Sequence, residues 1–374
     1  MESPNKNFDA STLRDRFRKS WLPVAATVGA FAGFVSAALK FRPEPKRVSG
    51  AASPPPLPIA AEQSTGSPPL TYELQYAKSV VIGIPGSAHR FQRSLTGVAA
   101  GPKDEIYCLG DDEINVFDSG GAFLRSWKVL RDPSCLTVTA DGHVYVGALG
   151  KIEVYDRTGN RSGGFSAAEA GKPAVVTALK VFRNEILVAD AGARCIHRYD
   201  QNGKQLGVIG TRNNAGNFML PNRWLDFDVD ANGLIMATDT GRHLVEAWAL
   251  DGSPVGSFGK FGMTDPAHFV GCCNPVNLAL TPDGKVVTAE KMIARVKVYE
   301  PTGKLMAVIG PENFDPACTH IYLAVDSTGR ILAADPVRRT ITIFSRVEKG
   351  SPSRPLTSDV SATDPRKRGE FNIL

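Results

Sequence analysis

Short apolar runs alternate with turn residues in a regular order between Phe269 and Pro311. Pro-Asp-Gly, Glu-Lys and Pro-Thr-Gly stand between the runs. Apolar runs about five residues long that are joined by such turn residues are typical of β-strands in a meander. The segment therefore predicts four consecutive strands, which is the composition of one β-propeller blade. The strands are expected at residues 277–281, 286–289, 295–299 and 305–309.

The same pattern recurs at a spacing of about 40 to 50 residues, as in repeat proteins, between Thr71 and Glu348. The sixth unit stops after its third strand, whereas residues 78–84 resemble the fourth strand of the fifth unit. Pairing 78–84 with 340–344 would close the ring and remove exposed sheet edges. The sequence thus predicts an all-β, six-bladed β-propeller over residues 71–348 that an N-terminal strand closes. The third strands of its six units are expected at 114–117, 152–155, 195–199, 244–248, 295–299 and 340–344.

In most units the second strand ends in a carboxylate, and an Arg follows before the third strand. Residues 186–190 with Arg194, and 234–239 with Arg242, show this order. The pattern resembles the NHL repeat, and the resemblance covers about three quarters of the chain. It implies a propeller of NHL type, similar to membrane-anchored or secreted bacterial propellers without an established role, and therefore a fold but no particular reaction. The second unit departs from the pattern, because Ala148 stands where the carboxylate is expected.

The N-terminal region predicts a membrane anchor. Residues 1–20 are polar and basic, and residues 21–39 carry no charge, which is close to the roughly 20 apolar residues that cross a bilayer. Cleavage after Val35-Ser36-Ala37 is the alternative, but basic residues follow at once, so an uncleaved transmembrane helix or signal anchor is favoured. Residues 40–70 are rich in Pro, Ser and Ala and predict a linker. We expect a cytoplasmic N-terminal segment, an extracytoplasmic propeller (periplasmic in a Gram-negative cell) and a disordered tail at 349–374.

Charge argues against a nucleic-acid partner. The chain carries 43 Lys and Arg against 38 Asp and Glu, for a net charge of +5. The basic excess concentrates near the two ends, which fits membrane-proximal segments better than a nucleic-acid groove.

Candidate binding residues fall on one face of the expected propeller. In a meander blade, the loop before the first strand and the turn after the second strand lie on the same face, around the channel mouth. Repeated residues there either bond the loop backbone and one another or form a mouth for an anion or a polar ligand. They are Asp112, Asp190, Asp239, Glu290 and Asp335, with Arg194, Arg242, Arg295 and Arg338 a few residues later.

Cys272 and Cys273 are not explained by the repeat, and they precede Asn274 and the first strand of the fifth unit. They fit two small buried residues that pack in a loop, a vicinal disulfide, or ligands of a metal ion together with Cys318 and His320. We therefore expect function to centre on this mouth. The predicted ligand-binding residues are Cys272, Cys273, Asn274, Glu290, Lys291 and Arg295, with Asp190, Arg194, Asp239, Arg242 and Asp335 around them.

Two classes of function remain open. One is a scaffold that binds another protein or a small polar ligand. The other is a metal-dependent hydrolase or lyase, because propellers of similar architecture include amidating lyases with His-bound zinc and lactonases with carboxylate-bound calcium. The candidate metal residues are His243, His268, Cys318 and His320, for zinc, copper or calcium, with Glu290 as the base. The scaffold is favoured over the enzyme, because no complete ligand set stands at a recognisable spacing.

Overall fold

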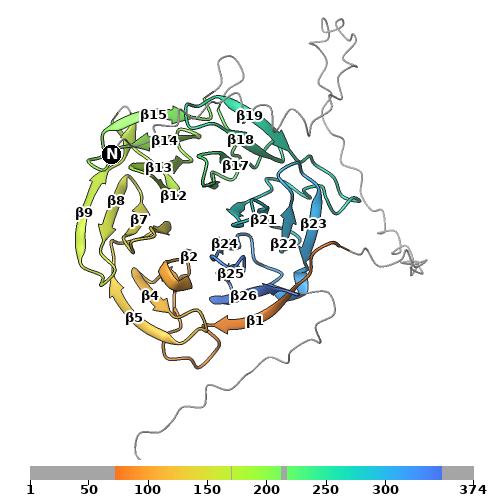
Figure 1. The fold of residues 1–374 in the computed structure, drawn as a ribbon, viewed down its shortest axis with the longest axis horizontal. Helices are drawn as coiled ribbons and strands as arrows, with labels where there is room; N and C mark the ends of the chain where they lie inside the picture. The colour runs from red at the N-terminus through yellow and green to blue at the C-terminus, as the bar shows by residue number, and fades with distance from the viewer. Residues whose placement is uncertain (1–71, 170, 212–216, 348–374) are drawn as a thin grey trace, which may run out of the picture. The chain divides into compact units, whose positions relative to one another are not determined.

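The computed structural model describes residues 72–169, 171–211 and 217–347. In this part of the chain, six four-stranded antiparallel sheets surround a central channel as the blades of a propeller (Figure 1). The predicted N-terminal segment, membrane helix, linker and tail, residues 1–20, 21–39, 40–70 and 349–374, lie outside the described residues. Among the residues that are described, no helix has the length and apolar character to cross a membrane.

The first three blades follow one another in chain order, with the first strand of each nearest the channel. Blade 1 consists of β2 (Gly97–Ala100), β3 (Ile106–Gly110), β4 (Glu113–Phe117) and β5 (Phe123–Lys128). Blade 2 consists of β6 (Cys135–Val138), β7 (Val144–Ala148), β8 (Lys151–Tyr155) and β9 (Arg161–Ser166). Blade 3 consists of β12 (Val176–Phe182), β13 (Glu185–Asp190), β14 (Cys195–Tyr199) and β15 (Gln205–Ile209). A small hairpin of β10 (Ala168–Glu169) and β11 (Lys172–Pro173) lies between blades 2 and 3.

The other three blades complete the ring. Blade 4 consists of β16 (Phe227–Val229), β17 (Ile235–Asp239), β18 (Leu244–Trp248) and β19 (Pro254–Phe258). Blade 5 consists of β20 (Asn277–Leu280), β21 (Val286–Glu290), β22 (Arg295–Tyr299) and β23 (Leu305–Ile309). Blade 6 consists of β24 (Tyr322–Val325), β25 (Ile331–Asp335), β26 (Thr340–Arg346) and β1 (Tyr76–Ile82). The described helices are the short 3-10 turns η1 (Pro102–Asp104) and η2 (Pro311–Asn313).

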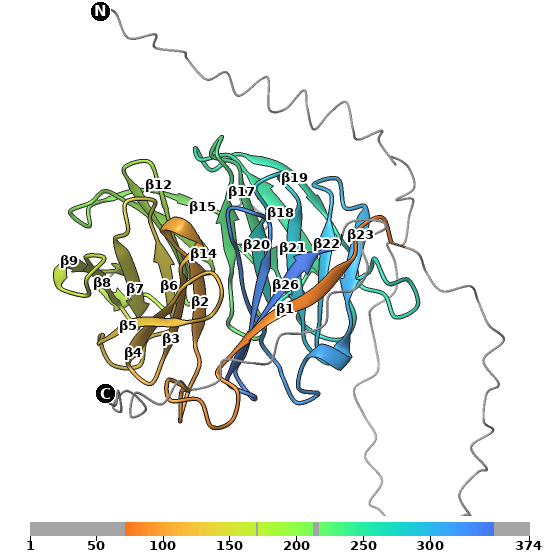
Figure 2. The same cartoon turned by 60° about the horizontal axis from the view of Figure 1, so that its bottom comes forward.

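The N-terminal strand closes the ring as the sequence predicts. β1 pairs antiparallel with β26, from Tyr76 opposite Arg346 to Ile82 opposite Ile341, and Figure 2 shows the two strands side by side. The pairing begins two residues before the expected 78–84. The last blade is thus built from both ends of the propeller sequence, which leaves no blade incomplete.

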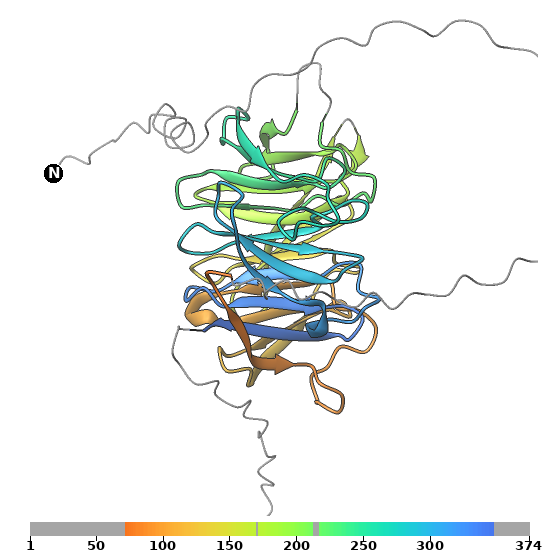
Figure 3. The same ribbon diagram turned by 90° about the vertical axis from the view of Figure 1, so that its right-hand side faces the viewer.

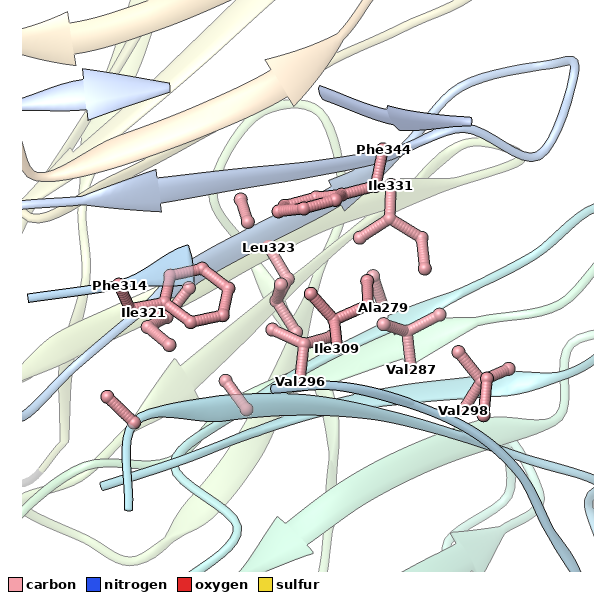
Figure 4. Packing of buried hydrophobic residues seen from close by; sticks show 14 of the residues in the cluster. Ala279, Val287, Val296, Val298, Ile309, Phe314, Ile321, Leu323, Ile331 and Phe344 are labelled. Carbon is pink, nitrogen blue, oxygen red and sulfur yellow. The ribbon is translucent and has the colours of Figure 1, made fainter. Parts of the chain in front are cut away.

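Burial explains why the strands form where they do. The outer strands β5 and β9 alternate between exposed and partly buried residues, as a sheet with one wet face requires. The second strands are buried on both faces, because each blade packs between two neighbours. Six apolar clusters fill the spaces between adjacent blades, one for each pair. Figure 4 shows the cluster between blades 5 and 6, where Val296 and Ile309 face Leu323 and Phe344.

The two faces of the propeller carry different connections (Figure 3). We call the face with the loops between blades and the turns between second and third strands the loop face. The opposite face, with the turns between first and second strands, is the hairpin face. The predicted channel mouth belongs to the loop face.

Candidate functional site

Carboxylates end the second strands on the loop face, and they fasten the loop that enters their own blade. Asp190 Oδ1 accepts hydrogen bonds from the backbone N–H groups of Val175, Gly192 and Ala193 at 2.8–3.2 Å. Burial opposes ionisation of Asp190, but hydrogen bonds from His197 and these N–H groups outweigh it and lower the pKa of Asp190. This carboxylate is therefore charged and fully engaged.

The same arrangement recurs in the other blades that carry the carboxylate. Asp239, Glu290 and Asp335 are buried. In the loops that precede their blades, the N–H groups of Met219 (3.2 Å), Val270 (3.3 Å) and Asp315 (2.7 Å) donate to Asp239, Glu290 and Asp335 respectively. These contacts match the structural interpretation of the repeat. Ligand binding by these carboxylates stays a prediction.

The repeated arginines divide into paired and unpaired. Arg242 pairs with Asp239, and Arg295 with Glu290. Arg338 donates to the carbonyls of Asn313 (3.0 Å) and Phe314 (2.6 Å). Arg194 is exposed, and no ion pair or hydrogen bond of its side chain occurs within the described residues. Of the predicted set, Arg194 is thus among the residues open to a ligand.

Blade 2, which has Ala148 in place of the carboxylate, uses its backbone instead. Gly150 N donates to Ala174 O (2.8 Å), and Ala167 N donates to Gly150 O (3.0 Å). Gly150 has a φ of 66°, and a Cβ there would clash with Pro173. The β10–β11 hairpin that lies in this loop accompanies the exchange of a side-chain anchor for a backbone anchor.

Asn274 belongs to the framework of the blade 5 mouth. Its Nδ2 donates to the carbonyls of Val270 (2.6 Å) and Lys291 (3.1 Å), and its Oδ1 accepts from Lys291 N (2.9 Å). Cys272 and Cys273 are both free thiols, the first exposed and the second buried. Burial raises the pKa of Cys273. On this loop, therefore, Cys272 and the Lys291 side chain are the predicted residues within reach of a partner.

The structure does not assemble the candidate metal residues into one site. His243 Nε2 lies 2.7 Å from Gly271 O, whereas His268 Nε2 pairs with Asp265 at 3.2 Å. Cys318 Sγ donates to His320 O (3.4 Å), and burial followed by the charge of Lys291 lowers the pKa of His320 to about 3. Within residues 72–169, 171–211 and 217–347, no group of three or more His, Cys, Asp or Glu has an arrangement that could hold a metal ion. These residues do not fit zinc, copper or calcium, so we derive no metal-dependent step.

Sequence reasoning missed three polar residues that organise the loop face. Asp111, and not Asp112, receives the N–H groups of Gln92 and Ser94 in blade 1. His197 lies 3.4 Å from Asp190 in blade 3. Lys297, the third, is described next. The signal for His197 and Lys297 was a titratable residue between apolar neighbours in a third strand.

Lys297 is fully buried in blade 5. Its Nζ lies 3.1 Å from Glu290 Oε1 and donates to the carbonyls of Pro266 (3.0 Å) and His268 (2.8 Å). Burial lowers the pKa of Lys297 to about 8, and Glu290 opposes that shift. The ammonium lies 4.6 Å from the centre of the Phe269 ring. Lys297 thereby holds the long loop before β20 against its blade.

Large apolar side chains gather on the loop face. Seven of the eleven exposed large hydrophobic residues of the described chain lie in its loops and turns, and the other four lie on or beside outer strands. The most exposed are Met263 (74%) and Met292 (68%). We define the apolar patch as the members contributed by the loops and turns of blades 4 and 5. It consists of Met219, Phe261, Met263, Met292 and Ile293.

Contacts between blades 4 and 5 join the members of the apolar patch. The His243 ring lies 5.3 Å from the Phe261 ring, and its Nε2 reaches Gly271 O. Gly271 in turn lies so close to the Met292 thioether that a Cβ at this position would clash with it. The patch is therefore one surface across two blades, because each loop rests on the next.

Comparisons with known proteins reach the fold and stop there. No protein-family model and no curated protein matches the chain. Three solved structures are similar to it. A chain of the "Crystal Structure of Mitotic Checkpoint Complex" is 12% identical, with 77% of this chain and 97% of that chain covered and a TM-score of 0.50. The WD40 β-propeller domain of Doa1 is 19% identical (67% and 78% covered, TM-score 0.47), and a streptogramin B lyase is 11% identical (74% and 98% covered, TM-score 0.49). The first of them supports the propeller fold, and the other two add no argument. The NHL type stays a prediction.

Proposed function

We propose that this protein is a protein-binding scaffold whose propeller binds a partner through the apolar patch on its loop face. The observation that carries the proposal is the gathering of exposed Met, Phe and Ile side chains on one face. Contiguous exposed apolar surface marks interaction sites in soluble domains. Flexible Met side chains adapt to a partner's shape.

The charges around the patch indicate an acidic, amphipathic partner. Lys260 and Lys291 precede Phe261 and Met292 directly, and Arg223 lies in the same loop as Met219. None of these three cations has an ion pair within residues 72–169, 171–211 and 217–347, whereas Asp265 is engaged by His268. A partner segment with alternating apolar and acidic side chains would complement the surface.

The proposal includes a location. The uncharged segment 21–39 and the Pro-rich residues 40–70 support a membrane-tethered propeller outside the cytoplasm. Protease added to intact spheroplasts should remove the propeller and leave a short membrane-bound fragment. Full protection of the propeller until the membrane is lysed would show the opposite orientation.

Site-specific photo-crosslinking in cells tests the binding surface. A crosslinker placed at Met292 or Met263 should capture one discrete protein. The matched control position is Leu206, an exposed apolar residue on the outer strand β15, which should not capture it. Equal capture at both positions, or crosslinks to lipid alone, would contradict the proposal.

The captured partner then allows a quantitative test. Met292→Asp should weaken binding of the purified partner at least about tenfold, while Leu206→Asp should leave it unchanged. Lys291→Glu should also weaken binding and reduce its dependence on salt, because it removes one of the complementary charges. Unchanged affinity in both Met292→Asp and Lys291→Glu would overturn the assignment of the surface.

A further inference from the structure

The channel encloses a cavity that opens away from the apolar patch. Its volume is about 980 Å³, and the first strands of all six blades line it. The lining continues into turns of the hairpin face, including Asp230–Asn232 and Pro282–Gly284, and contains no residue of the loop-face turns. The cavity therefore opens on the hairpin face. Its size is that of a site for a small organic molecule.

An aromatic cluster covers the other end of the channel. The Trp224 ring lies 4.1 Å from His320 and 5.9 Å from Tyr322, and His320 lies 4.5 Å from Tyr322. Trp224 precedes blade 4, whereas His320 and Tyr322 belong to the start of blade 6. These blades are not neighbours, so the contact spans the channel and gives the cavity a closed, aromatic end. Tyr322 itself lines the cavity.

Asp226 is the unusual group in this cavity. It is 7% exposed and lines the cavity close to its closed end. One hydrogen bond reaches its carboxylate, from Leu278 N to Oδ2 (2.8 Å), although a carboxylate can accept about four. Its Oδ1 accepts none from the residues that the structure describes. The hydroxyl of Tyr322 also makes no hydrogen bond within this part of the chain.

The other acidic residues of the lining are already engaged. Asp228 pairs with Lys180 (3.0 Å), Asp283 with Lys285 (2.6 Å) and Asp326 with Arg330 (2.5 Å). Asp230 caps its own turn by accepting from Asn232 N and Leu234 N. The lining has five Asp and one Lys in total, so the cavity attracts cations, and Asp226 is the carboxylate with an oxygen to offer.

We propose that the channel binds a small organic ammonium compound, with its charge against Asp226 and its apolar body among the inner strands. The Tyr322 hydroxyl would accept a second hydrogen bond from the ammonium, and the Tyr322 ring would face the charge. Val98, Leu136, Leu179 and Leu280 supply apolar walls for the body of the ligand. A bare metal ion fits less well, because the described residues contain no cluster of three or more ligands.

The electrostatic state of Asp226 agrees with such a ligand. Burial raises the pKa of Asp226 to about 7, and the Leu278 N–H and the charge of Lys180 oppose that shift. A cation at Oδ1 would supply the partner that the carboxylate lacks. This site is independent of the proposed partner surface, since the two lie at opposite faces.

Titration with a charge series tests the proposal on the intact propeller. Phenethylammonium, phenethyl alcohol and hydrocinnamate share one aromatic body, and hexylammonium, hexanol and hexanoate share an aliphatic one. For at least one body, the ammonium should bind about tenfold or more tightly than the alcohol, and the carboxylate should bind most weakly. In Asp226→Asn the preference for the ammonium should shrink to about threefold or less.

Asp230→Asn is the matched control, because it removes an acidic charge from the same cavity and keeps a side chain able to cap the turn. It should retain the ammonium preference. The proposal is overturned if neither ammonium binds at about 10 mM, if the alcohols bind as tightly as the ammonium compounds, or if Asp226→Asn keeps the preference. Circular dichroism confirms that each variant is folded.

The pH dependence gives a second readout. Asp226 faces Lys180 on β12, Asp228 on β16, Cys135 on β6 and Tyr322 on β24, while β20 contributes Asn277 and Leu278. Burial raises the pKa of Cys135 to about 12 and that of Tyr322 further above its usual value. Ammonium affinity should therefore increase several-fold between pH 6 and pH 8, roughly across the Asp226 titration, and stay flat in Asp226→Asn. A flat wild-type profile contradicts the role of Asp226.

Discussion

Asp190 on the loop face and Asp226 in the channel are both buried aspartates, 3% and 7% exposed, but they are bonded differently. Asp190 accepts three backbone N–H groups and faces His197, and its pKa is lowered. Asp226 receives a single hydrogen bond, and its pKa is raised to about 7. Burial is common to both, so the number of partners decides the sign. A carboxylate with all its partners holds loops in place, whereas one with a free oxygen is a cost until a ligand arrives.

The largest effect is expected from Glu290, the loop-face carboxylate that faces two buried cations. Glu290→Ala leaves Lys297 and Arg295 without their anion. Removal of one partner from a buried ion pair costs about 3–5 kcal/mol. The midpoint of urea unfolding should fall accordingly.

Two controls sharpen this prediction. Glu113→Ala removes an exposed pair with Lys128 and should cost less than about 1 kcal/mol. Lys297→Met added to Glu290→Ala should recover part of the loss, because the unpaired ammonium is removed. A loss for Glu290→Ala no larger than for Glu113→Ala would show that this network does not stabilise the blade.

Asp226→Asn should have the opposite sign. A raised folded-state pKa gives stability that is fully present below the unfolded-state value near 3.8 and is lost as pH rises through about 7. At about 1.4 kcal/mol per pH unit between the two pKa values, the variant should gain up to roughly 4 kcal/mol at pH 8 and almost nothing at pH 4. Melting temperatures at both values measure the difference. Destabilisation at pH 8 would mean that the ionised Asp226 already has a partner.

Asp190→Asn should be destabilising, by about 1–3 kcal/mol at neutral pH. The lowered pKa means that Asp190 contributes stability above its unfolded-state pKa, and that this contribution is lost as pH falls through the lower folded-state value. Wild type and variant should therefore converge in acid and separate as pH rises. Denaturation midpoints from pH 3 to pH 7 test the trend, and a constant gap across that range would contradict it.

Sequence patterns predicted the fold well because local chemistry determines it. The turn residues between apolar runs marked six units, and the incomplete sixth unit located the closing strand, which pairs as β1 with β26. The candidate site was harder, because its residues depend on contacts between blades. Asp226, Asp228 and Asp230 alternate along β16 and its turn, which could have placed them on the channel side. What no pattern could show is that Asp228 and Asp230 are engaged while Asp226 is not.

The smallest effects are expected at the paired cysteines, where the structure separates two residues that the sequence treats as one feature. Cys272 is exposed and Cys273 is buried with a φ of 64°. Cys272→Ser should change stability by less than about 0.5 kcal/mol. Cys273→Ser buries a hydroxyl and should cost on the order of 1 kcal/mol. Both should still bind the partner captured at Met292 if the thiols serve packing. Loss of binding in Cys272→Ser, with an unchanged melting temperature, would instead extend the binding surface from the apolar patch to the cysteine loop, because Cys272 follows Gly271, on which the Met292 side chain rests.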